Sequence, residues 1–126
     1  MSKQVIHTDH APAAVGTYSQ AIKVGNTVYI SGQLGLDPAT MQLKEGFDAQ
    51  ARQAFDNLEA IAKAAGGNLN DTVKFNVSLT DLADFALLNT VFEERLSAPY
   101  PARAAVQVAA LPKGGVVEIE AILQLA

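Results

Sequence analysis

The chain has 126 residues, of which 49% are hydrophobic and 17% charged, so we expect one folded domain spanning residues 1–126. It contains no cysteine, which excludes disulfides, thiolate metal sites and cysteine nucleophiles. A net charge of −4 without any Lys/Arg cluster disfavours a nucleic-acid partner. Neither a signal peptide nor a membrane-spanning apolar run is apparent, which predicts a soluble cytoplasmic protein without a membrane partner.

The first third of the chain is expected to be an extended arm followed by a hairpin. Residues 1–17 indicate an arm or edge strand that leads into a turn-prone segment after Ala11. Gly25-Asn26 separates two β-rich runs, residues 18–24 and 27–31, and both residues tolerate the positive φ of a two-residue turn. The second strand ends in residues 31–35, whose two glycines permit close approach of a neighbouring strand or a ligand.

Apolar residues at helical spacing predict two amphipathic helices. The first covers residues 47–65 and ends at Gly66-Gly67. The second begins at the capping segment 80–84. Its predicted stripe consists of Leu82, Phe85, Leu88, Asn89, Phe92 and Leu96. A strand predicted at residues 72–79 lies between the helices, which indicates at least one crossover connection.

The last two strands are predicted at residues 100–108 and 116–123. The element order β-β-β-α-β-α-β-β then indicates an α+β fold: a six-stranded mixed sheet with both helices packed on one face. In the final strand, Glu118 and Glu120 share a face with Val116 and Ile122. A sheet face that only meets water rarely carries such apolar residues, so we expect another copy of the chain to cover it.

This second face is also the expected place of a binding site. We expect Arg103 and one of the two glutamates to lie in a partly dry crevice there. Because a guanidinium is planar and permanently charged, it suits a small substrate that bears a carboxylate.

Several separated motifs, in order along nearly the whole chain, resemble the RidA (YjgF) family. They are Pro12 with Tyr18-Ser19-Gln20-Ala21, Val28-Tyr29-Ile30-Ser31-Gly32-Gln33, Asn57-Leu58 with Ala64-Ala65-Gly66, residues 80–85, Pro101-Ala102-Arg103, and Leu111-Pro112-Lys113 followed by Glu118-Ile119-Glu120-Ala121. The resemblance implies a homotrimer of chorismate-mutase-like subunits with active sites in the clefts between them. It also implies hydrolysis of 2-imino acids, such as 2-iminobutanoate and 2-iminopropanoate, to 2-oxo acids and ammonia, without a cofactor or metal.

The resemblance assigns roles to six residues by motif position. Arg103 would hold the substrate carboxylate, and Glu120 would position or activate water. The remaining positions would line the pocket: Tyr18, Ser31, Gly32 and Asn89. Many relatives carry Ser-Cys directly after the arginine, whereas this chain has Ala104-Ala105. We interpret this departure as a change in substrate range.

Each of these residues also has a structural interpretation. Arg103 could be an edge-strand arginine that pairs with a glutamate, and Glu118 competes with Glu120 for the catalytic role because they share a strand face. Either glutamate could instead pair with a lysine, Lys74 or Lys113. Tyr18 could be a packing residue, Ser31 could bond local backbone, and Asn89 could clamp the helix to a loop.

Other classes of function fit the sequence less well. His7 and His10 lack the further ligands that would complete a metal site. A non-catalytic module that binds small molecules or protects proteins through the same clefts remains an alternative. A chorismate-mutase-type enzyme has only fold analogy in its favour. A ribonuclease fits poorly with the acidic balance of the chain.

Overall fold

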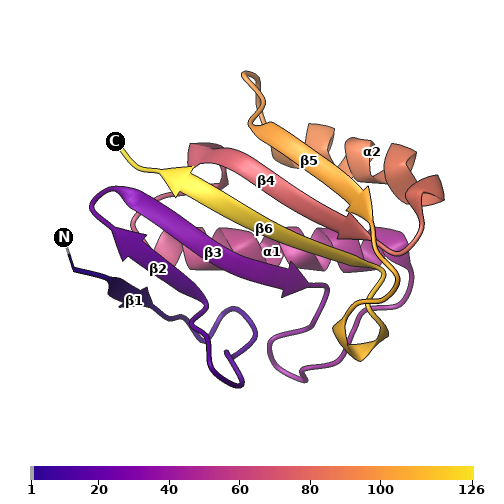
Figure 1. Ribbon diagram of the computed structural model, residues 1–126, viewed down its shortest axis with the longest axis horizontal. Helices are drawn as coiled ribbons and strands as arrows, with labels where there is room; N and C mark the ends of the chain where they lie inside the picture. The colour runs from indigo at the N-terminus through magenta and orange to yellow at the C-terminus, as the bar shows by residue number, and fades with distance from the viewer. Residues whose placement is uncertain (1) are drawn as a thin grey trace.

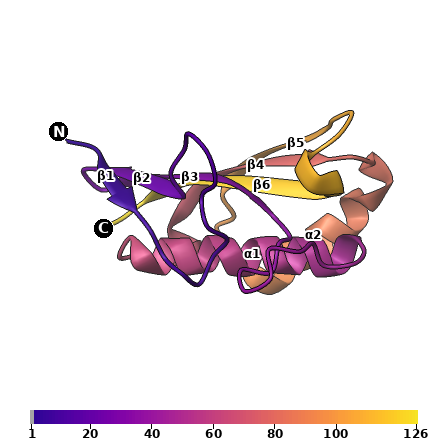
Figure 2. The same cartoon turned by 90° about the horizontal axis from the view of Figure 1, so that it is seen from below.

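The structure is a computed structural model, and it describes residues 2–126. Its helices and strands are β1 (Gln4–Ile6), β2 (Ala21–Val24), β3 (Thr27–Leu34), α1 (Phe47–Ala64), β4 (Thr72–Leu79), α2 (Phe85–Arg95), β5 (Ala102–Gln107) and β6 (Val117–Gln124). They form a six-stranded sheet in the order β1-β2-β3-β6-β4-β5, with both helices against one face (Figures 1 and 2). The predicted fold class and element order are confirmed.

The sheet is mixed because two crossovers pass over the same face. Strands β4 and β5 pair in parallel and are joined through α2. Strands β3 and β4 are both antiparallel to β6, which lies between them, and are joined through α1. The remaining pairs are antiparallel, including the β2–β3 hairpin, whose turn takes a positive φ at Gly25 of 58°. The predicted arm contributes β1 as the edge strand beside β2.

The core lies between the sheet and the two helices. The apolar stripe of α1 is fully buried at Ala51, Ala54, Phe55, Leu58, Ile61 and Ala62. Phe55 on α1, Phe75 on β4 and Phe92 on α2 meet edge to face, with ring centroids 5.0–5.8 Å apart. Such pairs stabilise the fold by about 0.5–1.5 kcal/mol each beyond their buried area. This cluster therefore fixes α2 against β4.

The predicted stripe of the second helix is wrong at its start. Leu82 lies in a short 3₁₀ turn, Leu82–Asp84, and its side chain is 45% exposed. Asp81 caps this turn by accepting a hydrogen bond from the Ala83 amide, 2.9 Å long. Because a 3₁₀ helix has three residues per turn, the spacing of apolar positions in α2 does not continue back into this segment. Val91, which the stripe omitted, is completely buried instead.

A bulge interrupts β3 next to β6. Ile30 pairs with Ala121 and Gln33 with Ile119, so the two residues Ser31 and Gly32 face the single residue Glu120. Bulges of this kind bend a strand and re-aim its side chains. Neither helix in residues 2–126 has the length and hydropathy needed to cross a membrane.

Candidate active site

The largest hollow beside the predicted site residues opens where β3 ends and β6 begins. It has a volume of about 690 Å³. The residues that line it are Pro12, Ala13, Val15, Tyr18, Ser31, Gly32, Gln33, Leu34, Leu36, Met41, Pro112, Lys113, Glu118 and Glu120. Four of the six predicted site residues are among them, and we call this hollow the carboxylate cavity after its two glutamates.

Ser31 is held by the segment that precedes β2. Its hydroxyl donates a 2.6 Å hydrogen bond to the Ser19 carbonyl, and its amide donates one of 2.9 Å to the Gln20 carbonyl. The predicted bond to backbone is therefore observed, across the chain rather than locally. Since its proton is engaged in this bond, Ser31 offers the cavity mainly its oxygen lone pairs.

Gln20 is a buried residue that sequence reasoning did not single out as part of the site. Its side chain, 2% exposed, accepts a hydrogen bond from the Thr8 amide and donates to the Thr8 and Pro12 carbonyls. These bonds tie the arm to β2 and shape the wall of the cavity around Pro12. The sequence signal for this role is a polar amide side chain directly before Ala21, where β2 begins.

Tyr18 stands at the rim of the carboxylate cavity. Its side chain is 53% exposed, and its hydroxyl accepts a 3.4 Å hydrogen bond from the Val15 amide. An exposed tyrosine with a weakly held hydroxyl is not a core-packing residue, which leaves it free to contact a ligand.

The two glutamates of β6 share the cavity but differ in surroundings. Glu120 is exposed, and its Oε1 accepts a 3.1 Å hydrogen bond from Asn76 Nδ2 on β4. Glu118 is half-buried. Its burial and, to a lesser extent, the negative charge of Glu120 raise the pKa of the Glu118 carboxyl. The predicted pairing with Lys74 or Lys113 is absent from the ion pairs formed within residues 2–126.

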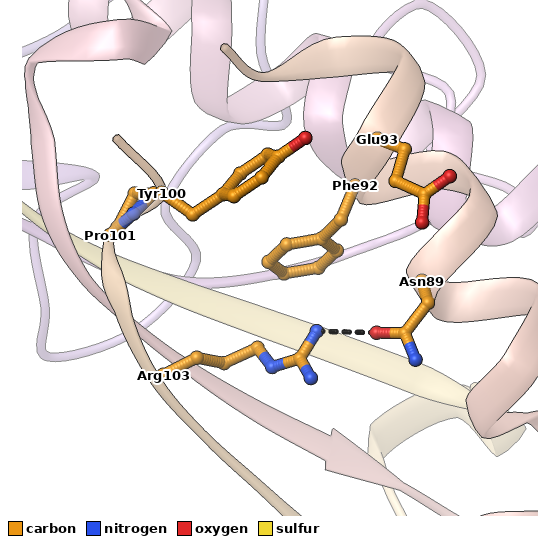
Figure 3. Close-up of a pocket in the computed structure, with 6 residues that line it drawn as sticks. All are labelled: Asn89, Phe92, Glu93, Tyr100, Pro101 and Arg103. Atoms are coloured by element: carbon orange, nitrogen blue, oxygen red, sulfur yellow. Dashed lines mark hydrogen bonds between the residues drawn. The ribbon is translucent and has the colours of Figure 1, made fainter. Parts of the chain in front are cut away.

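The other two predicted site residues, Arg103 and Asn89, meet at the far edge of the sheet. Arg103 Nη1 donates a 2.8 Å hydrogen bond to Asn89 Oδ1 on α2 (Figure 3). The guanidinium carbon lies 5.1 Å from the ring centre of Phe85 and 5.0 Å from that of Phe92. Asn89 therefore clamps α2 to a side chain of β5 rather than to a loop.

A smaller hollow of about 400 Å³ surrounds this arginine. Tyr100, Pro101 and Glu93 complete its lining (Figure 3). Arg103 makes no ion pair within residues 2–126, so its expected alternative role as a partner of a glutamate is not observed. We call Arg103 with Asn89, Phe85 and Phe92 the arginine cluster.

The expectation that Arg103 and a glutamate share the second face of one sheet is wrong. Arg103 pairs with Phe75 in the parallel register, which turns its side chain toward the helices. Glu120 pairs with Asn76, the next residue of β4, and therefore points to the opposite face. Within one chain, the carboxylate cavity and the arginine cluster are separate half-sites.

The two alanines after the arginine lie on opposite faces of β5. Ala105 pairs with Val77 and packs against the core, whereas Ala104 is exposed and pairs with Asn76, the residue that bonds Glu120. Alanine at position 104, where many relatives have serine, thus changes the exposed sheet face that also carries Glu120.

Among residues 2–126, the two histidines of the arm do not belong to a group that could hold a metal. His7 is exposed and bonds Asp9 at 3.1 Å. Within residues 2–126, no three His, Cys, Asp or Glu side chains are placed to hold a metal ion.

The chain is similar to characterised families over nearly its whole length. The family model described as Endoribonuclease L-PSP matches residues 8–124. The 2-iminobutanoate/2-iminopropanoate deaminase of Bos taurus is 54% identical over 121 residues, which cover 95% of this chain and 88% of that protein. A RutC family protein of Sinorhizobium fredii is 55% identical over 121 residues, covering 95% of this chain and 96% of the relative.

Solved structures agree with these sequence comparisons. The crystal structure of RidA from an Antarctic Psychrobacter species is 77% identical, with a TM-score of 0.95 over 97% of this chain and 99% of that one. Escherichia coli TdcF, solved with bound serine, is 41% identical, with a TM-score of 0.92 over 98% of this chain and 100% of the other. The chain therefore belongs to the RidA (YjgF) family.

Proposed function

We propose that this protein hydrolyses reactive 2-imino acids, 2-iminobutanoate and 2-iminopropanoate, to the corresponding 2-oxo acids and ammonia. The observation that carries the proposal is the presence of two half-sites: an arginine, Arg103, without an acidic partner among residues 2–126, and a cavity that presents Glu120 beside the backbone of Gly32. The name of the bovine relative supports the same reaction. The enzyme would limit damage from imines released by pyridoxal-phosphate-dependent dehydratases.

The site in this proposal lies between copies of the chain in a homotrimer. Arg103 and Glu120 lie on opposite faces of one sheet, so a site that uses both must take them from different copies. Strand β5 is an exposed sheet edge, with only Ala105 partly buried. A neighbour that lays this edge over the carboxylate cavity brings its Arg103 toward Glu120. Repeating that contact around a three-fold axis closes the ring and completes three sites.

The proposed reaction depends more on orienting the substrate than on activating it. The Arg103 fork binds the substrate carboxylate in a bidentate manner and fixes the position of the imine carbon. A protonated imine carbon is electrophilic, so water attacks it once Glu120 accepts a proton from that water. Asn89 fixes the guanidinium by accepting a hydrogen bond from it, and Tyr18 lies at the rim of the cavity.

Ribonuclease activity, which the description of the family model suggests, is disfavoured by charge. The chain carries a net charge of −4, and Glu118 and Glu120 line the cavity with Lys113 as its single Lys or Arg among residues 2–126. An RNA phosphate backbone would be repelled by such a surface rather than bound.

The proposal is tested by coupling the protein to threonine dehydratase with threonine and following 2-oxobutanoate. We expect the wild-type protein to speed its appearance and Arg103→Ala, if folded, to speed it far less. Absence of acceleration by the wild-type protein, together with calorimetric binding of 2-oxobutanoate, would identify a non-catalytic binding module instead.

A further inference from the structure

We propose that Glu118 is a second catalytic residue of this site: its carboxyl donates a proton to the departing amine, while Glu120 accepts the proton of water. This inference rests on the deaminase function proposed above, and it gives separate tasks to two glutamates of one strand.

The neighbouring strand β3 leaves space for the Glu118 side chain at Gly32. A methyl group at Gly32 would lie only 2.8 Å from the Glu118 carboxyl carbon and 3.1 Å from its Oε1. Gly32 has no positive φ, so its backbone does not require glycine. The absence of a side chain at position 32 instead leaves the space that the Glu118 carboxyl fills at the wall of the cavity.

Within one chain, the groups packed around Glu118 offer its negative charge no compensation, and in the assembly proposed above the charge of the neighbour's Arg103 is engaged by the substrate carboxylate. Strands β3 and β4 present Leu34 and Ser78 in register with it, neither of which is charged. The titratable groups that line the same cavity are Glu120 on its own strand, with Tyr18 and Lys113 from the loops.

None of these groups stabilises the ionised form of Glu118. Within residues 2–126 no hydrogen bond or ion pair reaches its carboxylate, whereas Asn76 bonds that of Glu120. Burial and the nearby charge of Glu120 raise the pKa of Glu118. A carboxyl group whose proton affinity is raised is suited to act as the acid in such a reaction.

The reaction balances with these two groups. Water oxygen bonds to the carbon of the protonated imine, the C=N π electrons move to nitrogen, and a water proton passes to the Glu120 carboxylate. Glu118 then protonates the amino group of this carbinolamine. The C–N bond breaks, ammonia leaves with the electron pair, and the hydroxyl proton returns to Glu118 as the carbonyl forms. Ammonia finally takes the proton from Glu120, so the protonated imine, water and enzyme yield 2-oxo acid, ammonium and unchanged enzyme.

The decisive measurement is the pH dependence of kcat in the dehydratase-coupled assay for Glu118→Gln, Glu118→Asp and Glu120→Gln. We expect Glu118→Gln to lower kcat on the order of 100-fold and to abolish the fall in activity on the alkaline side. Glu118→Asp, which keeps a carboxyl, should retain that fall. Glu120→Gln should lose the acid-side limb instead. Glu45→Gln, an exposed carboxylate in the loop before α1, is the matched control and should change neither limb.

Two further variants separate catalysis from structure. Glu118→Ala should regain part of its kcat when formate or acetate is added, because a small acid can occupy the vacated space. Gly32→Ala, which displaces the Glu118 carboxyl, should reproduce the profile of Glu118→Gln. Thermal melting checks that each variant is folded.

The outcomes distinguish the two proposals. If the wild-type protein is active and Glu118→Gln keeps its kcat and its alkaline limb, or changes only KM, the role of Glu118 is overturned while the deaminase function stands. If the wild-type protein gives no acceleration, the deaminase function fails and the role of Glu118 fails with it.

Discussion

The arginine cluster and the carboxylate cavity are built in opposite ways. Arg103 is fixed on three sides by uncharged groups, the Asn89 amide and the rings of Phe85 and Phe92, so its position is set while its charge stays available. The glutamates are loosely bonded, with Asn76 on Glu120 and no donor on Glu118 within residues 2–126. This difference suits the proposed reaction, in which the cation must be preorganised and the acids must be free to exchange protons.

Removing the cation should have the largest effect. We expect Arg103→Ala to lower kcat/KM for 2-imino acids on the order of 100-fold, because the substrate loses its orienting contact. Arg103→Lys keeps the charge without the bidentate fork and should lie between alanine and wild type. Steady-state kinetics of the folded variants provides the measurement, and wild-type rates in Arg103→Ala would remove the arginine cluster from the site.

Mixing two impaired variants tests whether the two half-sites come from different copies. Equal amounts of Arg103→Ala and Glu120→Gln, unfolded together and refolded, should recover roughly a quarter of wild-type activity, since that fraction of sites draws an intact residue from each neighbour. Each variant refolded alone serves as the control. A mixture no more active than its components would mean that both residues serve the same site from one chain.

Weakening the support of the arginine should have a moderate effect. Asn89→Ala removes one hydrogen bond to the guanidinium, worth about 1 kcal/mol, and should raise KM roughly fivefold with little change in kcat. Asn89→Asp retains an acceptor but adds a charge that competes with the substrate carboxylate. We therefore expect it to raise KM more than alanine does, and the reverse order would show that only the placement of Arg103 matters.

The smallest effect concerns stability and pH. The pKa of Glu118 is raised in the folded chain, so the protonated form favours folding and stability is lost as pH rises from the ordinary value of 4.5 through the folded value. Glu118→Gln has no such loss. Its free energy of unfolding, measured by urea unfolding, should exceed that of wild type by up to about 1 kcal/mol at pH 7. Well below pH 4.5, the two free energies should be equal. A variant that is less stable at pH 7 would contradict this electrostatic account.

Local patterns predicted most of the fold because local physics determines it. Helical spacing located α1, which ends within one residue of the predicted boundary, and Gly25 located the hairpin through its positive φ. The error at Leu82 arose where a capped 3₁₀ turn, which has no distinct apolar period, precedes α2.

The site was predicted less completely, because the alternation of residues along a strand shows which of them share a face but not which face meets the helices. Arg103 and Glu120 were each placed in a strand, but only the register of β5 against β4 decides that Arg103 turns toward the helices. The contacts of Asn89 and Gln20 depend on segments that meet only in the folded chain.

The bulge in β3 has a consequence for how this scaffold can diversify. Before it, the even-numbered residues Val28 and Ile30 face the helices, and after it the odd-numbered Gln33 does so, which sends Leu34 toward Glu118. Deleting one residue at the bulge would restore regular alternation and leave one residue opposite Glu120, with Gln33 still toward the helices and Leu34 still beside Glu118. A change of chain length by one residue would thus reshape the cavity wall opposite Glu120, while the helix-packed layer keeps its composition on both sides of the bulge.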